Sequence, residues 1–180
     1  MLLAIDVGNT NTVFAVFKNN ELIGQWRAAT DPLKTADEYV VWLNQLFKNS
    51  QLTLDDIKSS ILSTVVPQCQ FAVVDMCERY CGCTPINVGV EGIELGIEIN
   101  VESPREVGAD RLANAVGAHS TYKTALTIID FGTATTFDVL IKNVYHGGVI
   151  APGLKLSLNM LISNASVSYT HLTLPTNREV

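Results

Sequence analysis

The sequence predicts an α/β protein in which one structural unit is present twice, with a cleft between the two copies. Strand-like and helix-like segments alternate up to about residue 120, and a new series of strands begins near residue 125. Each series opens in the same way, with an apolar strand, an aspartate, a glycine, small hydroxyl residues and a second strand. These openings contain residues 6–12 and 130–136, and their similarity indicates a duplicated architecture.

The first series is expected to contain five strands and three helices. Thr35 and Glu38 have the spacing of a capping box, and apolar residues at helical spacing from Tyr39 to Phe47 continue that first helix. Pro67 opens the second helix. The strands are expected at residues 2–6, 12–18, 21–28, 61–66 and 85–88, and the third helix at about 107–119.

The second series is shorter, with strands at residues 125–130, 135–141 and 144–150 and a helix at about 153–163. Three strands and one helix make a poor independent core. We therefore expect a complete first domain at residues 1–120 and an incomplete second domain at residues 121–165.

The last fifteen residues lose this pattern. Residues 166–180 resemble the translated adapter tail of fragmentary assembled sequences, so we expect the native sequence to end near Ser163–Ala165. The alternative is a genuine exposed terminal strand. A chain whose second core is incomplete would expose apolar surface and tend to aggregate.

Composition and charge exclude several classes of function. The formal net charge is −6 and no basic stripe is present, which argues against nucleic acid as a partner. No apolar run approaches the about 20 residues that cross a bilayer. The N-terminus lacks the basic flank and cleavage pattern of a signal peptide, so we expect a cytoplasmic protein without membrane contact.

Four cysteines lie close together in the sequence, at Cys69, Cys77, Cys81 and Cys83. A zinc site is one interpretation, but no Cys-x2-Cys pair is present and the first spacing is wide. Reduced, mostly packed thiols are the favoured interpretation for a cytosolic protein.

The two similar openings have the chemistry of phosphate loops. Gly8 and Gly132 could take a positive φ and let the backbone approach a ligand closely, and successive N–H groups in such a turn form an anion-binding concavity. Asp6 and Asp130 would repel a phosphate unless a cation such as Mg²⁺ lay between them. Two such loops facing each other would hold one polyphosphate from both sides, which predicts a nucleotide site.

A third group of residues lies at the start of the helix near residue 107. Asp110 in a first helical turn complements the helix dipole, which is a sufficient structural reason for it. The alternative is catalytic: Asp110 takes a proton from an alcohol, while Arg111 and the helix N–H groups hold an anionic substrate. The residues alone leave the two interpretations equal.

Other polar residues are weaker candidates. Asp138 could be a further cation ligand, but is expected to cap a turn or face solvent. The glycines of Gly147-Gly148 and Pro152-Gly153 could cradle phosphate or simply form turns. The histidines pair with no visible nucleophile or metal spacing and are treated as non-catalytic; they are His119, His146 and His171.

Four segments together closely resemble type III pantothenate kinase, in order and with matching spacing from Met1 to about Ser163. They are residues 6–12, 108–111, 130–136 and 147–153. One phosphate loop alone is shared by the whole actin-like, sugar-kinase and heat-shock ATPase superfamily, whereas the four together are specific. The resemblance implies a ribonuclease-H-like (actin-like ATPase) domain, duplicated in the full-length family, with the second copy incomplete here.

The resemblance also implies an activity: transfer of the γ-phosphate of ATP to the primary hydroxyl of pantothenate, the first step towards coenzyme A. Asp110 matches the general base, Asp130 the ligand of a monovalent cation (K⁺ or NH₄⁺), and Asp6 lies near Mg²⁺. The family is homodimeric, so a dimer is expected for the full-length parent. The implied ATP-binding residues are Asp6, Val7, Gly8, Asn9, Thr10, Asn11, Thr12, Val13 and Thr133, and the implied pantothenate-binding residues are Gly108, Ala109, Asp110, Arg111 and Val101.

Two departures from the family pattern are visible. Many members have a tyrosine that contacts pantothenate where this chain has Val101. The family also continues well past residue 165, so this chain is expected to be inactive or impaired. Two other functions remain open: a superfamily kinase acting on a sugar or small acid, and a non-enzymatic transcriptional accessory factor. The acidic charge and the lack of a helix-turn-helix signal weigh against the second.

Overall fold

A five-stranded mixed sheet forms the first part of the fold, in the computed structural model that describes residues 1–90 and 92–164. The strand order is β3-β2-β1-β4-β5. The first three strands pair antiparallel, and β4 and β5 add in parallel. The strands are β1 (Leu2–Val7), β2 (Asn11–Lys18), β3 (Glu21–Ala29), β4 (Ser59–Thr64) and β5 (Ile86–Asn87).

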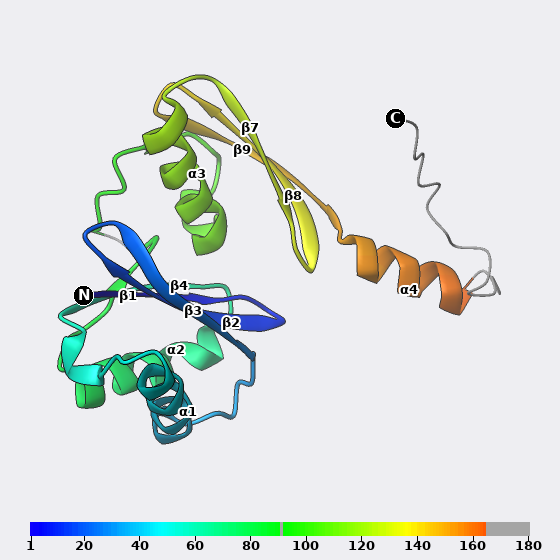
Figure 1. The fold of residues 1–180 in the computed structure, drawn as a ribbon. Helices are drawn as coiled ribbons and strands as arrows, with labels where there is room; N and C mark the ends of the chain where they lie inside the picture. Colours follow the sequence, from blue (N-terminus) through cyan, green and yellow to red (C-terminus); the bar gives the residue numbers. More distant parts are fainter. Residues whose placement is uncertain (91, 165–180) are drawn as a thin grey trace, which may run out of the picture.

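Two helices, α1 (Ala36–Asn49) and α2 (Pro67–Met76), cover one face of this sheet (Figure 1). The predicted capping box is confirmed, because the Thr35 side chain accepts from the N–H of Glu38 while the Glu38 carboxylate accepts from the N–H of Thr35. A π-helical turn, η2 (Cys77–Cys81), extends α2. Short 3₁₀ turns occur at η1 (Leu54–Asp56) and η3 (Pro104–Glu106).

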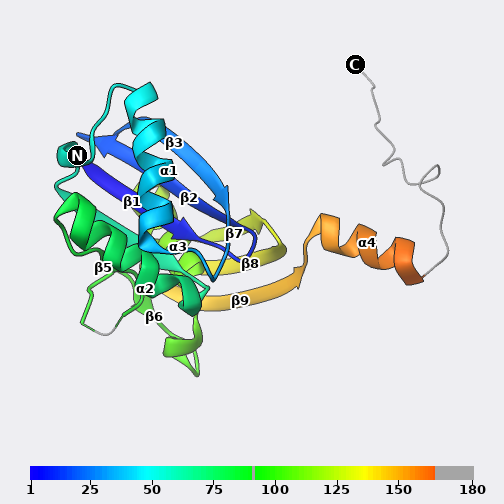
Figure 2. The same ribbon diagram turned by 90° about the horizontal axis from the view of Figure 1, so that it is seen from below.

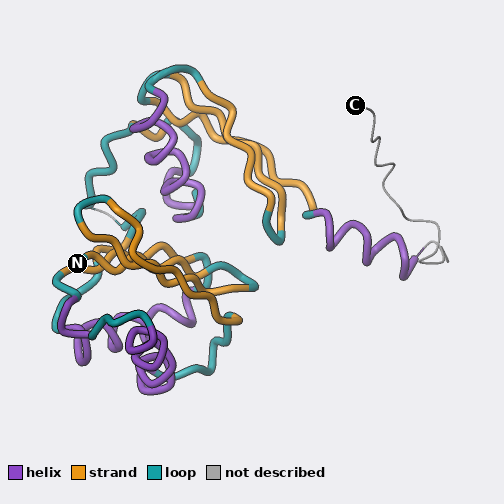
Figure 3. The backbone as a smooth tube through the Cα atoms, in the orientation of Figure 1, coloured by secondary structure: helices purple, strands orange, loops and turns teal. Residues whose placement is uncertain are grey.

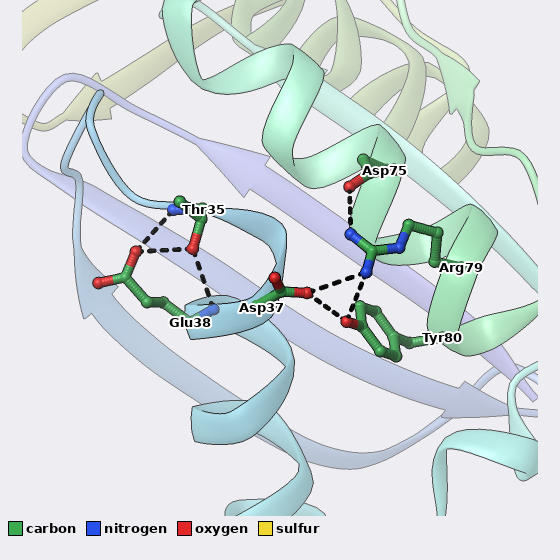
Figure 4. Close-up of polar contacts among 6 residues, drawn as sticks. All are labelled: Thr35, Asp37, Glu38, Asp75, Arg79 and Tyr80. Atoms are coloured by element: carbon green, nitrogen blue, oxygen red, sulfur yellow. Dashed lines mark hydrogen bonds and ion pairs between the residues drawn. The ribbon is translucent and has the colours of Figure 1, made fainter.

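Polar side chains tie these two helices together at one end (Figure 4). Arg79 donates to Asp75 one turn earlier, at 2.9 Å, and reaches Asp37 on α1 at 3.2 Å. The Tyr80 hydroxyl also donates to Asp37. Behind these contacts lies the first core, which we define by the fully buried side chains between sheet and helices; they include Leu3, Phe14, Tyr39, Leu43, Phe47 and Met76.

A second sheet has the order β6-β9-β8-β7. Its three long strands are antiparallel, and β6 pairs in parallel with β9. The strands are β6 (Glu98–Ile99), β7 (Leu126–Phe131), β8 (Ala134–Ile141) and β9 (Val144–Pro152). The second core is the small cluster of buried Ala115, Leu140 and Tyr145 with the partly buried apolar side chains around it.

The remaining helices are α3 (Ala109–Tyr122) and α4 (Leu154–Asn164). Helix α3 contacts β4 of the first sheet and β7 and β8 of the second, so it lies between them. Helix α4 continues from β9 away from both sheets (Figures 1 and 2). No helix among the described residues has the length and hydropathy needed to cross a bilayer.

The observed elements agree with the predicted ones to within a few residues. Figure 3 shows how helices and strands are distributed along the backbone. One arrangement was not visible in the sequence: β6 joins the second sheet, so sheet membership changes between β5 and β6. The predicted domain limit at residue 120 stays a prediction. The predicted non-native tail lies outside the described residues.

Candidate active site

The two phosphate-loop segments meet, although 123 positions separate them in the chain. The Thr10 and Thr133 hydroxyls are hydrogen-bonded to each other at 2.7 Å. Thr10 lies between β1 and β2, and Thr133 lies between β7 and β8. The two hairpins therefore face each other across a cleft between the sheets, which is the arrangement that a single polyphosphate would require.

Each hairpin places its aspartate at the same point, the penultimate residue of the first strand. Asp6 pairs with Val13 across the first hairpin, and Asp130 pairs with Thr136 across the second. The turns are closed by similar backbone hydrogen bonds, from the Gly8 N–H to Asn11 O at 3.0 Å and from the Gly132 N–H to Ala134 O at 2.9 Å. The aspartates therefore enter the cleft from opposite sides.

The expectation of a positive φ at the two loop glycines is wrong: neither has a left-handed backbone. At Gly8 a Cβ would lie 3.3 Å from the Asn11 carbonyl oxygen, a tight contact, so glycine is favoured there because the turn brings a carbonyl close to its Cα. At Gly132 a Cβ would lie 3.4 Å from the Ala134 carbonyl oxygen, which is close to an ordinary contact.

Hydrogen bonds from Thr30, just after β3, also hold the first loop in place. The Thr30 hydroxyl donates to the Gly8 carbonyl at 2.6 Å and is hydrogen-bonded to the Thr12 hydroxyl at 3.1 Å. Thr12 is fully buried. These contacts fix the backbone of the first hairpin without using the side chains that face the cleft.

Two adjoining hollows occupy the cleft, and both are lined by Asp6, Asp110 and Asp130. One, of about 380 Å³, lies against the two loops, with Asn9 and Thr133 among its lining residues. The other, of about 430 Å³, runs along the first sheet, and its far wall is mostly apolar; that wall includes Ala4, Ala15, Phe17, Ile61 and Val88. The site thus has a polar compartment and an apolar one that share three carboxylates.

These carboxylates influence one another. Burial raises the pKa of Asp6, and the negative charges of Asp110 and Asp130 raise it further. The negative charge of Asp130 is partly compensated, because the Asn114 amide donates a hydrogen bond to its Oδ2 at 3.1 Å. A cation near Asp6 would stabilise its ionised form, so the donor set fits a hard cation.

The candidate cation site is not a cluster of protein ligands within residues 1–90 and 92–164. No group of three histidine, cysteine, aspartate or glutamate side chains has the geometry of a metal site there. Mg²⁺ characteristically keeps several waters and takes ligands from substrate phosphates, so one or two carboxylates suffice. The cleft residues are compatible with such a shared site.

Asp110 lies in the first turn of α3, between the two sheets. Its Oδ1 accepts the backbone N–H of Arg111 at 2.7 Å. Gly108 precedes it as the helix N-cap, and a Cβ at Gly108 would lie 2.5 Å from Asp110 Oδ1. The glycine therefore makes room for this carboxylate.

The expected position of Asp138 is wrong, because it neither caps a turn nor faces solvent. It is fully buried and accepts from Arg111 Nε at 2.8 Å and from Nη2 at 2.5 Å. The Tyr145 hydroxyl donates to the same oxygen at 2.6 Å. An aspartate in an alternating strand gave no sign of this pairing, since its partner lies on a helix 27 positions away.

Val101, predicted at the pantothenate position, packs beside the second core and lies close to Gly147. The four cysteines are free thiols on the far side of the first sheet, and all but Cys83 are buried. Burial raises the pKa of Cys77 to about 12 and that of Cys81 to about 11, as is expected of packed thiols.

Comparison with known proteins identifies the family. The family model for type III pantothenate kinase matches residues 2–176. A type III pantothenate kinase from Paramagnetospirillum magneticum is 54% identical over 162 residues, covering 89% of this chain and 62% of the relative. One from Rhodospirillum centenum is 53% identical with the same coverage. The chain thus spans about three fifths of the length of these relatives.

Two solved structures share the fold at low sequence identity. A protein from Campylobacter jejuni described as a Baf family transcriptional activator is 16% identical with a TM-score of 0.51, covering 99% of this chain and 68% of that one. The ethanolamine utilization protein EutJ from Carboxydothermus hydrogenoformans is 14% identical with a TM-score of 0.50, covering 93% and 58%. With the family match over nearly the whole length, the chain belongs to the type III pantothenate kinase family.

Proposed function

We propose that this chain contains the nucleotide site and the catalytic base of a kinase that transfers the γ-phosphate of ATP to the primary hydroxyl of pantothenate. This is the first step of coenzyme A biosynthesis. The observation that carries the proposal is the convergence of two phosphate-loop hairpins and Asp110 on one cleft, in a member of this family.

The ATP phosphates would lie in the hollow beside Asn9 and Thr133, within reach of the backbone of both turns. Mg²⁺ near Asp6 and a monovalent cation, K⁺ or NH₄⁺, at Asp130 would neutralise charge on the phosphates. The raised pKa of Asp6 supports this role, because an uncompensated negative charge is costly there. Phosphoryl transfer needs mainly positioning and charge neutralisation, which this arrangement supplies.

Asp110 is proposed as the general base. The Arg111 N–H fixes Oδ1, so we assign Oδ2 to accept the proton of the attacking hydroxyl. Asp110 lines both hollows, which places it between the phosphates and an acceptor in the apolar compartment. Gly108, Ala109, Arg111 and Val101 are proposed to complete the acceptor site.

The finer features of the fold and the assembly are also proposals. The two hairpins with Asp6 and Asp130 in equivalent places support a ribonuclease-H-like unit that is duplicated. We infer a cytoplasmic protein whose full-length parent is a homodimer, and domain limits at residues 1–120 and 121–165.

The test measures phosphate transfer by this chain and by a chimera. In the chimera, residues 1–162 replace the matching segment of the Paramagnetospirillum magneticum relative, which supplies the rest of the protein. The chimera is expected to phosphorylate pantothenate with K⁺ but poorly with Na⁺, and not to phosphorylate hexoses or acetate. The chain alone is expected to bind Mg·ATP with little turnover.

Asp110→Asn tests the base. It should lower kcat of the chimera by about 10²–10⁴-fold and leave the affinity for ATP nearly unchanged. The matched control is Asp55→Asn, an exposed aspartate on η1 that should change neither. A near-normal kcat for Asp110→Asn would exclude the base role. Preference for a hexose would favour another kinase of the superfamily, and no transfer with any cation would favour the non-enzymatic accessory factor.

A further inference from the structure

A buried polar network joins the start of α3 to the second sheet. We call Arg111, Asp138 and Tyr145 the Arg111 network. All three donors, Arg111 Nε, Arg111 Nη2 and the Tyr145 hydroxyl, converge on one oxygen, Oδ1 of Asp138, at 2.8, 2.5 and 2.6 Å. The roles proposed for the two phosphate-loop hairpins and for Asp110 do not explain why this network is present.

We propose that Asp138 and Tyr145 are positioning residues, which fix the Arg111 guanidinium and thereby the helix turn that carries Asp110. The proposal rests on the proposed function, since it gives Arg111 a role in holding an anionic group of the acceptor. Asp138 itself lies too deep to touch a substrate, with its side chain 1% exposed against 14% for Arg111.

Electrostatics favour the pairing of Asp138 with Arg111. A buried carboxylate is costly unless a counter-charge and hydrogen bonds compensate it, and Arg111 supplies both. Burial alone would lower the pKa of Arg111, but its hydrogen bond to Asp138 and the nearby Asp138, Tyr145 and Asp110 together outweigh burial, so the net pKa is raised. The pKa of Tyr145 is also raised, by burial and by its bond to Asp138, so its hydroxyl remains a donor.

The sequence makes room for this pair at Gly148. Gly148 lies opposite Asp138 in the β8–β9 register. A Cβ there would collide with the Phe137 carbonyl oxygen and would lie 2.7 Å from Asp138 Oδ1 and 2.8 Å from Arg111 Nη2. The glycine is therefore required by the backbone of β8 as well as by the Asp138–Arg111 pair.

Asp138 engages only one edge of the Arg111 guanidinium. Arginine has five N–H donors, and Asp138 takes the Nε–H and one N–H of Nη2. The end formed by Nη1 and the second Nη2 proton has the fork geometry that suits a carboxylate. Because Asp138 prevents rotation of the fork, its orientation is set before an acceptor arrives.

The side chain and the backbone of Arg111 together connect the network to the base Asp110. The Arg111 side chain is tied to Asp138, and its backbone N–H donates to Asp110 Oδ1. Fixing one residue thus orients both the anion-holding group and the proton acceptor. A loss of Asp138 should therefore weaken acceptor binding more than nucleotide binding.

Asp138→Asn is the most informative variant because it is nearly isosteric and removes the negative charge that pairs with Arg111. Oδ2 of Asp138 is buried without a hydrogen-bond partner among the described residues, so the amide nitrogen that replaces it displaces no existing bond. Tyr145→Phe removes one donor and provides a second variant should the first fold poorly. Asp75→Asn, which breaks the exposed pair with Arg79, is the matched control.

The first measurement is hydrogen exchange of the Arg111 Nε–H by NMR in the 180-residue chain. In the wild-type chain this proton should exchange slowly compared with that of exposed Arg27. Exchange should become about tenfold faster in Asp138→Asn, less so in Tyr145→Phe, and should not change in Asp75→Asn. An Arg111 Nε–H that exchanges as fast as that of Arg27 in the wild type would overturn the network.

The second measurement is titration of the same chains with pantothenate and with Mg·ATP. Asp138→Asn should weaken pantothenate binding about tenfold and leave Mg·ATP binding unchanged. Equal weakening of both, or of neither, would overturn the positioning role. A wild-type chain with a protected Arg111 Nε–H that binds Mg·ATP but no pantothenate would contradict the acceptor role of Arg111, whereas the proposed function is tested separately by phosphate transfer in the chimera. The network itself would then remain established by the exchange result.

Discussion

The two sheets carry nearly the same hairpin but are packed very differently. The first is covered by α1 and α2, and the side chains between them, such as Phe14 and Phe47, have no exposed surface. Within residues 1–90 and 92–164, the core of the second has three buried apolar side chains, while Phe131 is 70% exposed and Val149 66%. The two loops therefore have equivalent geometry, but the cores that support them differ greatly in size.

The comparison teaches that the loop geometry is set locally. Each turn is closed by a backbone bond from its glycine, and each aspartate occupies the same register position whatever lies behind the sheet. Stability, by contrast, depends on how much apolar surface each sheet buries. Shape and stability can thus be perturbed separately in this molecule.

Cavity-creating substitutions should show the largest difference between the two regions. Phe47→Ala should cost about 3–5 kcal/mol, whereas Leu140→Ala in the second core should cost about 2–3 kcal/mol. Urea unfolding followed by tryptophan fluorescence and by amide exchange would measure both. Ile141→Ala, at a 45% exposed position next to Leu140, is the control and should cost little. Equal losses for Phe47→Ala and Leu140→Ala would mean that the two regions share one cooperative core.

Adding a methyl group should give effects of opposite sign at two glycines of the second region. Gly148→Ala places Cβ against the Phe137 carbonyl oxygen and the Arg111 network and should destabilise by about 1–3 kcal/mol. At Gly117 in α3 a Cβ would meet nothing, so Gly117→Ala should stabilise by about 0.5–1 kcal/mol. Thermal unfolding would compare the two. A neutral Gly148→Ala would show that the network tolerates displacement.

The contact between the loops should couple the two regions weakly. Thr10→Ala and Thr133→Ala remove the same exposed hydrogen bond, so each should cost about 0.5–1.5 kcal/mol and the double variant no more than either one. A double-mutant cycle in urea unfolding measures this coupling. Thr127→Ala, elsewhere on β7, should be additive with Thr10→Ala. Full additivity of the first pair would contradict contact in solution.

The pH dependence of stability should differ in sign between Asp6 and Glu38. The pKa of Asp6 is raised by burial, so its contribution to stability is present below the unfolded pKa and lost as pH rises through the folded one. Asp6→Asn should therefore raise Tm at pH 7 and have little effect at pH 3.

Glu38 behaves in the opposite way. Hydrogen bonds from the Thr35 N–H and hydroxyl lower the pKa of Glu38. Its contribution is therefore present above the unfolded pKa and lost as pH falls through the folded one. Glu38→Gln should slightly lower Tm at pH 7 and have no effect at strongly acid pH. If Asp6→Asn and Glu38→Gln changed Tm at pH 7 in the same direction, the causes assigned to the two pKa shifts would be refuted.

Most elements were predictable because their signals are local. The capping box at Thr35 and Glu38, the apolar spacing behind it and the paired hairpin patterns each lie within a few residues. The proposed roles of Asp6, Asp110 and Asp130 remain predictions. Their convergence on one cleft followed from the sequence only through the repeat and the family resemblance.

The rest depended on contacts between distant residues. Nothing near Asp138 indicates that it pairs with Arg111, and the two residues of β6 give no sign that they join β9 about 45 positions later. The loop glycines show a related limit: their sequence pattern suggested an unusual φ, but neither has one, and the constraint at Gly8 is a carbonyl that approaches across the turn. A partner distant in sequence leaves no periodic signature.

The start of α4 has a mechanical consequence for the second loop. The Gly153 N–H donates to the Thr133 carbonyl at 3.1 Å, and a Cβ at Gly153 would collide with the carbonyl oxygens of Gly132 and Thr133. The second loop and the start of α4 must therefore move together. A fluorophore on the neighbouring Leu154, 69% exposed, would report displacement of the loop without touching the cleft.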